Sequence, residues 1–166
     1  MTPNRHGSAV IELPNELDVV MTRKFDAPIE LVFDVLTKAE HVSRWFAPFT
    51  CQATACSIDL RVGGDYHMAF VTEDGAECSF RGSYLEVERP TRTVATWLFE
   101  GWPDAHAVET VELREAHGVT TMTSTLSFRD QAGRDHMTTF DGQEDSYDKM
   151  EDVLRSLLDQ EGSLSG

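Results

Sequence analysis

The sequence predicts an α+β domain in which an antiparallel sheet covers one face of a long C-terminal helix. Three observations support this fold class. Residues 17–48 have the pattern of a strand followed by a short helical section, residues 50–128 that of strand after strand, and helical periodicity returns only near the end. Consecutive strands with short connections are typical of a meander, and helices grouped apart from strands are typical of α+β domains. A chain of 166 residues is long enough to bury one core.

The first strand shows the two-residue period of a half-buried strand. Its alternating positions are Leu17, Val19, Met21, Arg23 and Phe25. Asp26 can then accept hydrogen bonds from the free N–H groups of a helix start, and Pro28 suits a first helical turn. Apolar residues follow at helical spacing: Ile29, Val32, Phe33 and Leu36. The sequence therefore predicts an amphipathic helix directly after the strand.

An aromatic cluster, residues 45–49, comes soon after this helix. It is interpreted either as ordinary core or as the mouth of an apolar cavity. Further along, Gly63-Gly64 indicates a tight bend and Glu73-Asp74-Gly75 a hairpin turn. Gly82, inside the strand Cys78–Val87, indicates a bulge or a close backbone approach. The last predicted strands are Val94–Phe99, Val108–Arg114 and Thr120–Phe128.

The terminal helix has an apolar stripe that is expected to pack on the sheet. Its members are Tyr147, Met150, Val153, Leu154, Leu157 and Leu158. The charged residues between them are expected to face solvent: Asp145, Asp148, Lys149, Glu151, Asp152 and Arg155. We expect one domain over residues 16–160, with flexible tails at 1–15 and 161–166.

With enough curvature, the space between the sheet and the terminal helix becomes a pocket. Strand alternation and the aromatic cluster give the residues expected to line it: Trp45, Phe46, Phe49, Tyr66, Met68, Phe70, Trp97, Phe99, Glu109, Val111, Met122, Ser124, Tyr147, Met150 and Leu154. The alternative is a solid core, for which aromatic side chains are equally well suited. Glu109 shares its face with apolar neighbours, where an unpaired carboxylate is costly. It therefore lies either at an open rim or beside a polar group of a ligand.

The net charge of −15 argues against nucleic-acid binding and against docking on anionic lipid. Three cysteines without a C-x-x-C pair give neither a disulfide framework nor a zinc motif. The acid–His–acid run Asp135–Asp141 suits a flexible loop at least as well as a metal site. No segment approaches the ~20 apolar residues that cross a bilayer, and no signal peptide is recognisable. We expect no cofactor, no metal, no membrane insertion and a cytoplasmic location.

Several separated motifs resemble the START-like, or SRPBCC, superfamily and, within it, homologues of the heat-shock protein 90 ATPase activator. They include Phe25-Asp26-Ala27-Pro28, the run 40–48, the strand start 58–66, Glu86–Pro90 and Thr96-Trp97. The resemblance covers roughly residues 17–160. It implies a helix-grip (START-like, Bet v-like) fold, a curved antiparallel sheet wrapped around a long C-terminal helix, with short helices after the first strand.

Three functions remain open from the sequence. The first is binding of a hydrophobic, lipid-like small molecule in the pocket. The second is an enzyme acting on a hydrophobic substrate there, of the cyclase or dehydratase kind that the resemblance implies, with Glu109 and Tyr147 as candidate groups. The third, implied by the resemblance, is a stress-response co-chaperone with a chaperone partner. Exposed strand edges and Trp102-Pro103 leave a homodimer open.

Overall fold

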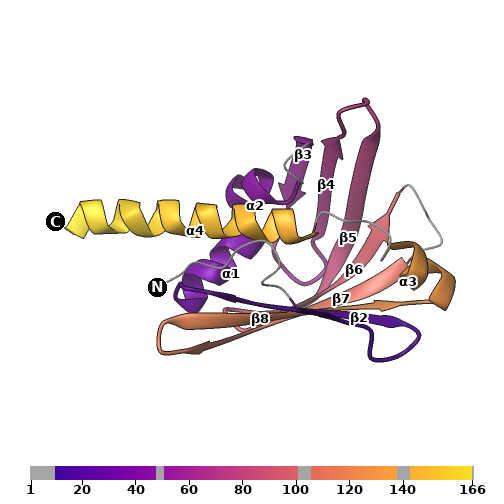
Figure 1. Cartoon of the computed structure of the whole chain (residues 1–166), viewed down its shortest axis with the longest axis horizontal. Helices are drawn as coiled ribbons and strands as arrows, with labels where there is room; N and C mark the ends of the chain where they lie inside the picture. Colours follow the sequence, from indigo (N-terminus) through magenta and orange to yellow (C-terminus); the bar gives the residue numbers. More distant parts are fainter. Residues whose placement is uncertain (1–9, 48–50, 101–105, 138–142, 166) are drawn as a thin grey trace.

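The computed structural model describes residues 10–47, 51–100, 106–137 and 143–165 (Figure 1). Its antiparallel sheet has the strand order β1-β2-β8-β7-β6-β5-β4-β3. The strands are β1 (Val10–Glu12), β2 (Asp18–Phe25), β3 (Gln52–Ile58), β4 (Asp65–Val71), β5 (Glu77–Glu88), β6 (Arg92–Phe99), β7 (His106–Ala116) and β8 (Val119–Phe128). The helices are α1 (Ile29–Thr37), α2 (Ala39–Trp45), α3 (Gln131–Met137) and α4 (Gln143–Ser165).

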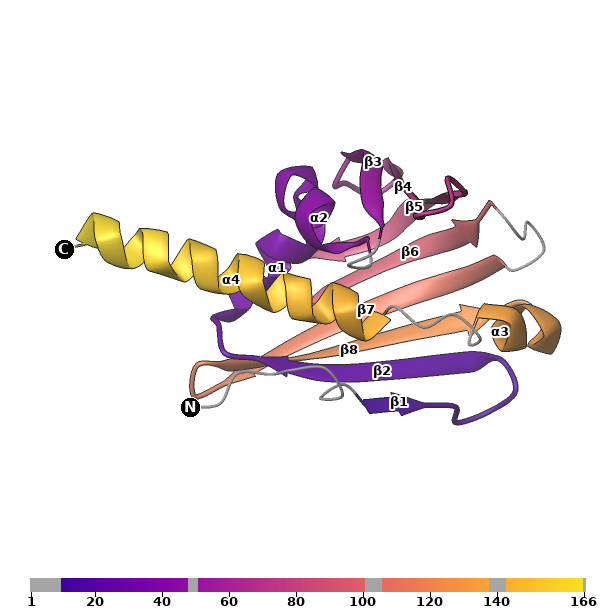
Figure 2. The ribbon, with the colours of Figure 1, turned by 45° about the horizontal axis from the view of Figure 1, so that its top comes forward.

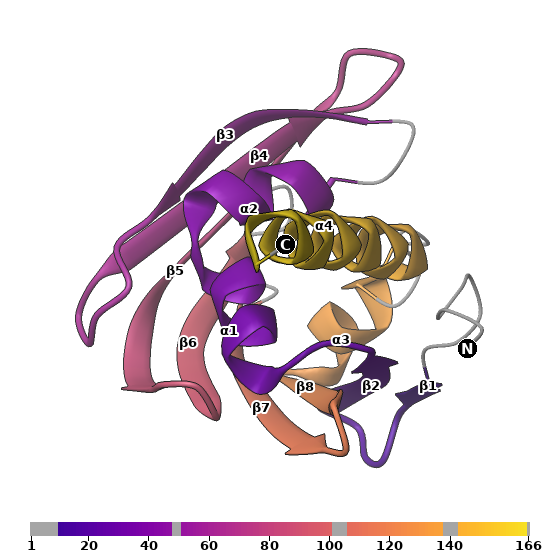
Figure 3. The same ribbon diagram turned by 90° about the vertical axis from the view of Figure 1, so that its left-hand side faces the viewer.

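The sheet curves around α4, and α1 and α2 lie beside α4 on its concave side. Viewed along α4, the strands form an arc from β3 to β1 with the helix inside it (Figure 3). Figure 2 shows α4 lying over the sheet, with α3 beyond its first turns. This is the helix-grip α+β fold, so the predicted fold class is confirmed. None of the helices in the described ranges is long and apolar enough to span a membrane.

Both ends of the chain carry more regular structure than the sequence pattern indicated. Within the segment 1–15, the strand β1 pairs antiparallel with β2, with Ile11 opposite Met21. At the other end, α4 continues to Ser165. The helix α3 covers Asp135, where a loop was expected, and Asp135 pairs there with Arg134 at 2.7 Å. The remaining part of the acid–His–acid run, residues 138–142, lies outside the described residues.

The start of α1 is capped differently from the prediction. No side chain of the adjacent residues caps the helix, so the proposed role of Asp26 is wrong. Instead, the backbone N–H of Ile29 donates to Oε1 of Glu115 at 2.7 Å. Glu115 lies 86 residues away, at the end of β7. The β7–β8 hairpin carries this carboxylate to the helix start, which only the folded sheet can arrange.

Gly82 lets two strands and a tyrosine ring come together. A Cβ at this position would lie 1.8 Å from the carbonyl oxygen of Thr96 and 2.7 Å from a ring carbon of Tyr66. A register shift follows between Tyr84 and Glu86. The expectation of a close backbone approach is confirmed, and a bulge accompanies it.

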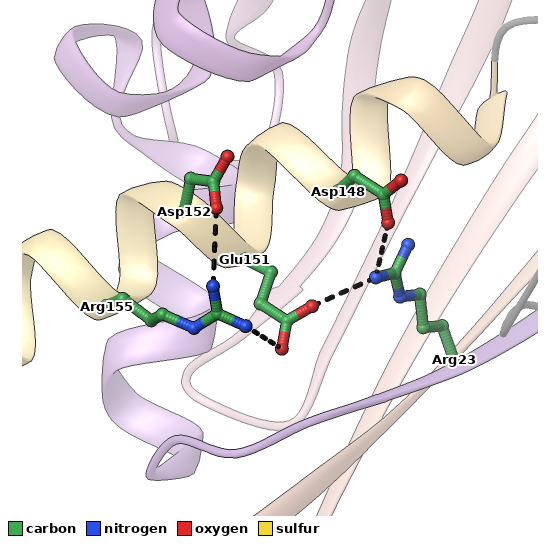
Figure 4. A network of polar contacts seen from close by, with 5 residues as sticks. All are labelled: Arg23, Asp148, Glu151, Asp152 and Arg155. Atoms are coloured by element: carbon green, nitrogen blue, oxygen red, sulfur yellow. Dashed lines mark hydrogen bonds and ion pairs between the residues drawn. The ribbon is translucent and has the colours of Figure 1, made fainter. Parts of the chain in front are cut away.

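A buried ion-pair network joins α4 to β2 (Figure 4). The guanidinium of Arg23, whose side chain has no exposed surface, lies 2.8 Å from Asp148 and 3.1 Å from Glu151. Glu151 also pairs with Arg155 at 3.2 Å. Glu151 is only 4% exposed, so its expected solvent position is wrong. It faces the sheet because Arg23 there supplies the charge that burial of a carboxylate requires.

Candidate functional site

The sheet and the helices α1, α2 and α4 enclose a cavity of about 120 Å³. Apolar side chains dominate its wall, and the polar members come mainly from β4 to β8. The lining residues are Met21, Phe33, Leu36, Thr37, Val42, Trp45, Ile58, Tyr66, Met68, Tyr84, Arg92, Thr93, Ala95, Glu109, Val111, Leu113, Met122, Ser124 and Tyr147. We call this space the central cavity.

Hydrogen bonds hold together the helices that form one wall of the central cavity. The indole N–H of Trp45 donates to the carbonyl of Val35 at 2.9 Å, which ties the end of α2 to α1. Two side chains of α4 reach the chain just after α2. The hydroxyl of Ser146 donates to the carbonyl of Phe46 at 2.9 Å, and the ammonium of Lys149 donates to that of Ala47 at 2.7 Å. These bonds tie α1, the end of α2 and the start of α4 together near Trp45, which lines the cavity.

Two tyrosines form the wall on the side of β4 and β5. The rings of Tyr66 and Tyr84 have centroids 5.7 Å apart and are tilted by 49°. The hydroxyl of Tyr66 donates to the carbonyl of Thr96 at 2.9 Å, across the gap that Gly82 leaves. Burial raises the pKa of Tyr66 well above its ordinary value and that of Tyr84 to about 12, and the nearby Glu109 adds to both shifts. Both phenols are therefore neutral at physiological pH.

Glu109 is the carboxyl group of the central cavity. It stands in the middle of β7, opposite Ala95 on β6 and Leu126 on β8. The hydroxyl of Ser124 donates to its Oε2 at 3.3 Å. Its neighbours Ala95 and Ser124 are 4% and 3% exposed, and the side chain of Glu109 lines the cavity. Burial raises the pKa of Glu109, and the hydrogen bond from Ser124 offsets part of the rise.

The structure brings part of the predicted site residues together around the central cavity. Those in its wall are Trp45, Tyr66, Met68, Glu109, Val111, Met122, Ser124 and Tyr147. Met150 and Leu154 are buried in the core formed by α4, α1 and the sheet. Phe46, Phe70, Trp97 and Phe99 lie in a separate row of aromatic contacts, and Phe49 lies outside the described residues.

The aromatic row runs along the concave side of β4, β5 and β6. Phe46 and Phe70 have ring centroids 6.1 Å apart, and Phe70 and Phe80 are 6.0 Å apart. Phe80 stacks on Phe99 at 5.1 Å, and Trp97 meets Phe128 edge-on at 5.8 Å. These rings pack against one another, which explains why they are absent from the cavity wall.

Several wall residues were not selected from the sequence. Tyr84 shares its strand face with Phe80 and Gly82, so strand alternation was sufficient to find it. Arg92 and Thr93 stand at the start of β6, next to a turn, and pattern alone gives no reason to select them. The guanidinium of Arg92 is held by Glu112 at 3.1 Å and Glu86 at 3.5 Å.

The described parts of the chain contain no site suited to metal binding or to thiol catalysis. Within them, no three His, Cys, Asp or Glu side chains are grouped to hold a metal ion. Burial raises the pKa of the Cys56 and Cys78 thiols, which disfavours the nucleophilic thiolate. The chemistry available in the cavity is therefore that of an apolar wall with neutral phenols, a few hydroxyls, the carboxyl group of Glu109 and the guanidinium of Arg92.

A sequence model of the family described as "Activator of Hsp90 ATPase homolog 1-like protein" matches residues 26–155. The chain belongs to this family. The predicted family resemblance is thereby confirmed, and it supports a ligand-binding or co-chaperone-like role in general terms. The search of curated proteins found no match.

Solved structures share the fold over most of their length. A crystal structure of a Rhodobacter sphaeroides protein is 18% identical, with a TM-score of 0.82 over 89% of this chain and 99% of the other. A Staphylococcus epidermidis protein is 26% identical, with a TM-score of 0.73 over 89% and 94%. An AHSA1-like protein from Aeromonas hydrophila is 19% identical, with a TM-score of 0.64 over 83% and 93%.

Proposed function

We propose that this chain binds a small, mostly apolar molecule in the central cavity. The observation that carries the proposal is a hollow of about 120 Å³ enclosed between sheet and helices, with a wall that is apolar except for a few polar groups. Small-molecule sites have this composition, in which apolar surface supplies affinity and a few polar groups supply orientation.

The volume limits the size of the molecule. An apolar cavity of about 150 Å³ accepts benzene. The central cavity in this conformation therefore suits a molecule of roughly that size, and a long lipid chain would require the helices to move apart. This refines the lipid-like ligand expected from the sequence to a compact ring or a short branched chain.

An unfilled cavity is costly for a folded protein. A hollow in the core forgoes the packing contacts that a larger side chain would make there. A larger side chain in place of Ala95 would fill the cavity, because Ala95 is small, buried and part of the cavity wall. A hollow kept next to such a residue favours a role for the space.

Titration with toluene, followed by protein NMR, tests the proposal. Wild-type protein should show saturable shifts at cavity residues such as Val111 and Met122. Ala95→Met should abolish these shifts because the longer side chain occupies the space. Ala76→Met, an identical change at an exposed hairpin position, should leave them intact. If toluene causes no saturable shift in wild-type protein, or binds equally well to Ala95→Met, the proposal is wrong.

A co-chaperone role is the second candidate, and the family match favours it. The matched family is named for activation of the Hsp90 ATPase, and the match extends over residues 26–155. The test is the steady-state ATPase rate of a bacterial Hsp90 with and without this chain. A saturable increase of about twofold or more, retained in Ala95→Met, would support a chaperone role independent of the cavity. An unchanged rate would remove this candidate.

A further inference from the structure

The hydrogen-bond donors in the wall of the central cavity are largely committed to acceptors in the protein. The Tyr66 hydroxyl and the Trp45 indole donate to the carbonyls of Thr96 and Val35, both at 2.9 Å. The Thr37 hydroxyl donates to the carbonyl of Phe33 at 2.7 Å. The Ser124 hydroxyl donates to Glu109. Most of these donors are therefore engaged by the protein, whereas the hydroxyls of Tyr84 and Thr93 can still donate or accept a hydrogen bond.

Glu109 adds acceptor capacity to the wall. Ser124 donates to Oε2, while a carboxylate offers about four lone-pair sites on its two oxygens. Among the described residues, no Lys, Arg or His forms an ion pair with Glu109. The basic residue in the wall, Arg92, is engaged by Glu86 and Glu112. The protein thus buries a carboxyl group without giving it a cation.

The surroundings of Glu109 suit a positive charge. The wall carries the rings of Tyr66, Tyr84, Tyr147 and Trp45. The faces of such rings attract ammonium groups, most strongly where water is excluded. The chain as a whole carries a net charge of −15, which raises the local concentration of cations and lowers that of anions.

We propose that the central cavity selects a small aromatic or branched aliphatic amine, whose ammonium group pairs with the carboxylate of Glu109 while its hydrocarbon part fills the apolar wall. This inference rests on the proposed binding function and names its ligand class. It also excludes carboxylic acids of the same size, because a second carboxylate would be placed beside Glu109 without a cation.

Pairing with an ammonium group changes the protonation of Glu109. In the empty cavity, burial favours its neutral form, and a bound cation favours the ionised form. Binding of a charged amine therefore releases a proton to the solvent at any pH where Glu109 was neutral beforehand. The other ionisable groups that face the cavity are Tyr66 on β4, Tyr84 on β5, Tyr147 on α4 and Arg92 on β6. Tyrosine and arginine side chains ordinarily titrate above about pH 9, so Glu109 is the group that responds at lower pH.

Calorimetric titration with four probes of one ring size tests the inference: benzylamine, benzyl alcohol, toluene and benzoate. Benzylamine should bind at least about tenfold more tightly than toluene, as expected for a hydrogen bond to a charged group. Benzyl alcohol should fall between them, and benzoate should not bind. Repeating the benzylamine titration in buffers of different ionisation enthalpy, near pH 5, should reveal the released proton.

The variant Glu109→Gln isolates the charge. It should reduce benzylamine binding to the level of toluene, abolish the proton release and leave toluene binding within about twofold. Glu88→Gln makes the same substitution at an exposed position and should leave all four affinities unchanged. If toluene binds but benzylamine binds no better, or if Glu109→Gln binds benzylamine as wild-type protein does, the amine inference is wrong and the binding function stands. If none of the four probes binds, both are wrong.

Discussion

Two carboxylates of this molecule are enclosed by the same fold, and the protein treats them differently. Glu151 of α4 receives the guanidinium of Arg23 at 3.1 Å and that of Arg155 at 3.2 Å. Glu109 of β7 receives a hydroxyl from Ser124 at 3.3 Å. The first is part of an ion-pair network that fastens the helix to the sheet (Figure 4). The second faces a hollow.

The difference separates a structural charge from a candidate functional one. A buried ion pair is costly to break, because the remaining partner keeps its desolvation penalty. A buried carboxyl group without a cation has a raised pKa and therefore stays neutral up to a higher pH. Such a group is a common mark of a binding or catalytic site, since its proton and its charge respond to whatever enters.

The largest effect is expected from the variant Arg23→Met. It leaves Asp148 and Glu151 without their shared buried cation and should lower the free energy of unfolding by about 3 kcal/mol, measured by urea denaturation. The double variant Arg23→Met with Glu151→Leu should recover part of this loss, because an apolar pair needs no compensation. A double variant less stable than the single one would contradict the view that the stranded carboxylate causes the loss.

The contrasting prediction concerns Glu109 and pH. Because the folded state raises its pKa above the ordinary value of 4.5, the native protein binds more protons than the unfolded chain between the two pKa values. Stability is therefore lost as pH rises through this window, by about 1.4 kcal/mol for each pH unit that separates the two values. Glu109→Gln should remove this loss, so the variant gains stability relative to wild type at pH 8 but not at pH 4.

Thermal or urea unfolding across pH 4–8 provides the measurement for Glu109→Gln. Glu88→Gln, on the exposed end of β5, serves as the matched control and should follow the wild-type curve. Parallel curves for wild type and Glu109→Gln would mean that Glu109 is not enclosed as the structure shows.

A smaller change is expected from Ser124→Ala. Removing the hydroxyl should cost about 1 kcal/mol and should raise the pKa of Glu109 further, because this hydrogen bond lowers it. The carboxyl carbon of Glu109, followed by NMR through a pH titration, reports the shift. Ser127→Ala removes another serine–carboxylate bond of β8, to Asp18 at 2.6 Å, and should leave the Glu109 titration unchanged. If Glu109 titrates identically in Ser124→Ala and Ser127→Ala, the hydrogen bond from Ser124 does not lower the pKa of Glu109.

The smallest effect is expected at the exposed end of the network. Arg155 is 38% exposed and pairs with Glu151 and Asp152 within one helical turn. Arg155→Ala should cost about 0.5 kcal/mol at low salt and less in 1 M salt, as surface pairs on helices do. A loss comparable to that of Arg23→Met would show that Arg155, rather than Arg23, supports Glu151.

Among the patterns in the sequence, strand alternation predicted the structure best. It placed Tyr66, Glu109, Val111, Met122 and Ser124 on the concave side, because side chains on a strand must alternate between its faces. The course of the sheet and the terminal helix followed from the same periodicities. The local pattern is enough for these features because each depends on residues close in the chain.

Features that depend on distant partners were missed. Helical periodicity assigned Glu151 to solvent, and its main partner, Arg23, is 128 residues away. The cap of α1 comes from Glu115 and not from the adjacent Asp26. The aromatic residues divided into a cavity wall and a packed row, because that depends on how rings fit together in three dimensions and not on their spacing. The volume of the hollow has no sequence signal at all.

The bonds from Ser146 and Lys149 to the carbonyls of Phe46 and Ala47 mean that α2 cannot lift away from the sheet alone. Any opening that widens the cavity toward Trp45 must break these two contacts or carry the first turns of α4 along. The two helices should consequently open as one unit. Amide hydrogen exchange should then slow in both by a similar factor when a guest occupies the interior, although they are separated by about a hundred residues of chain.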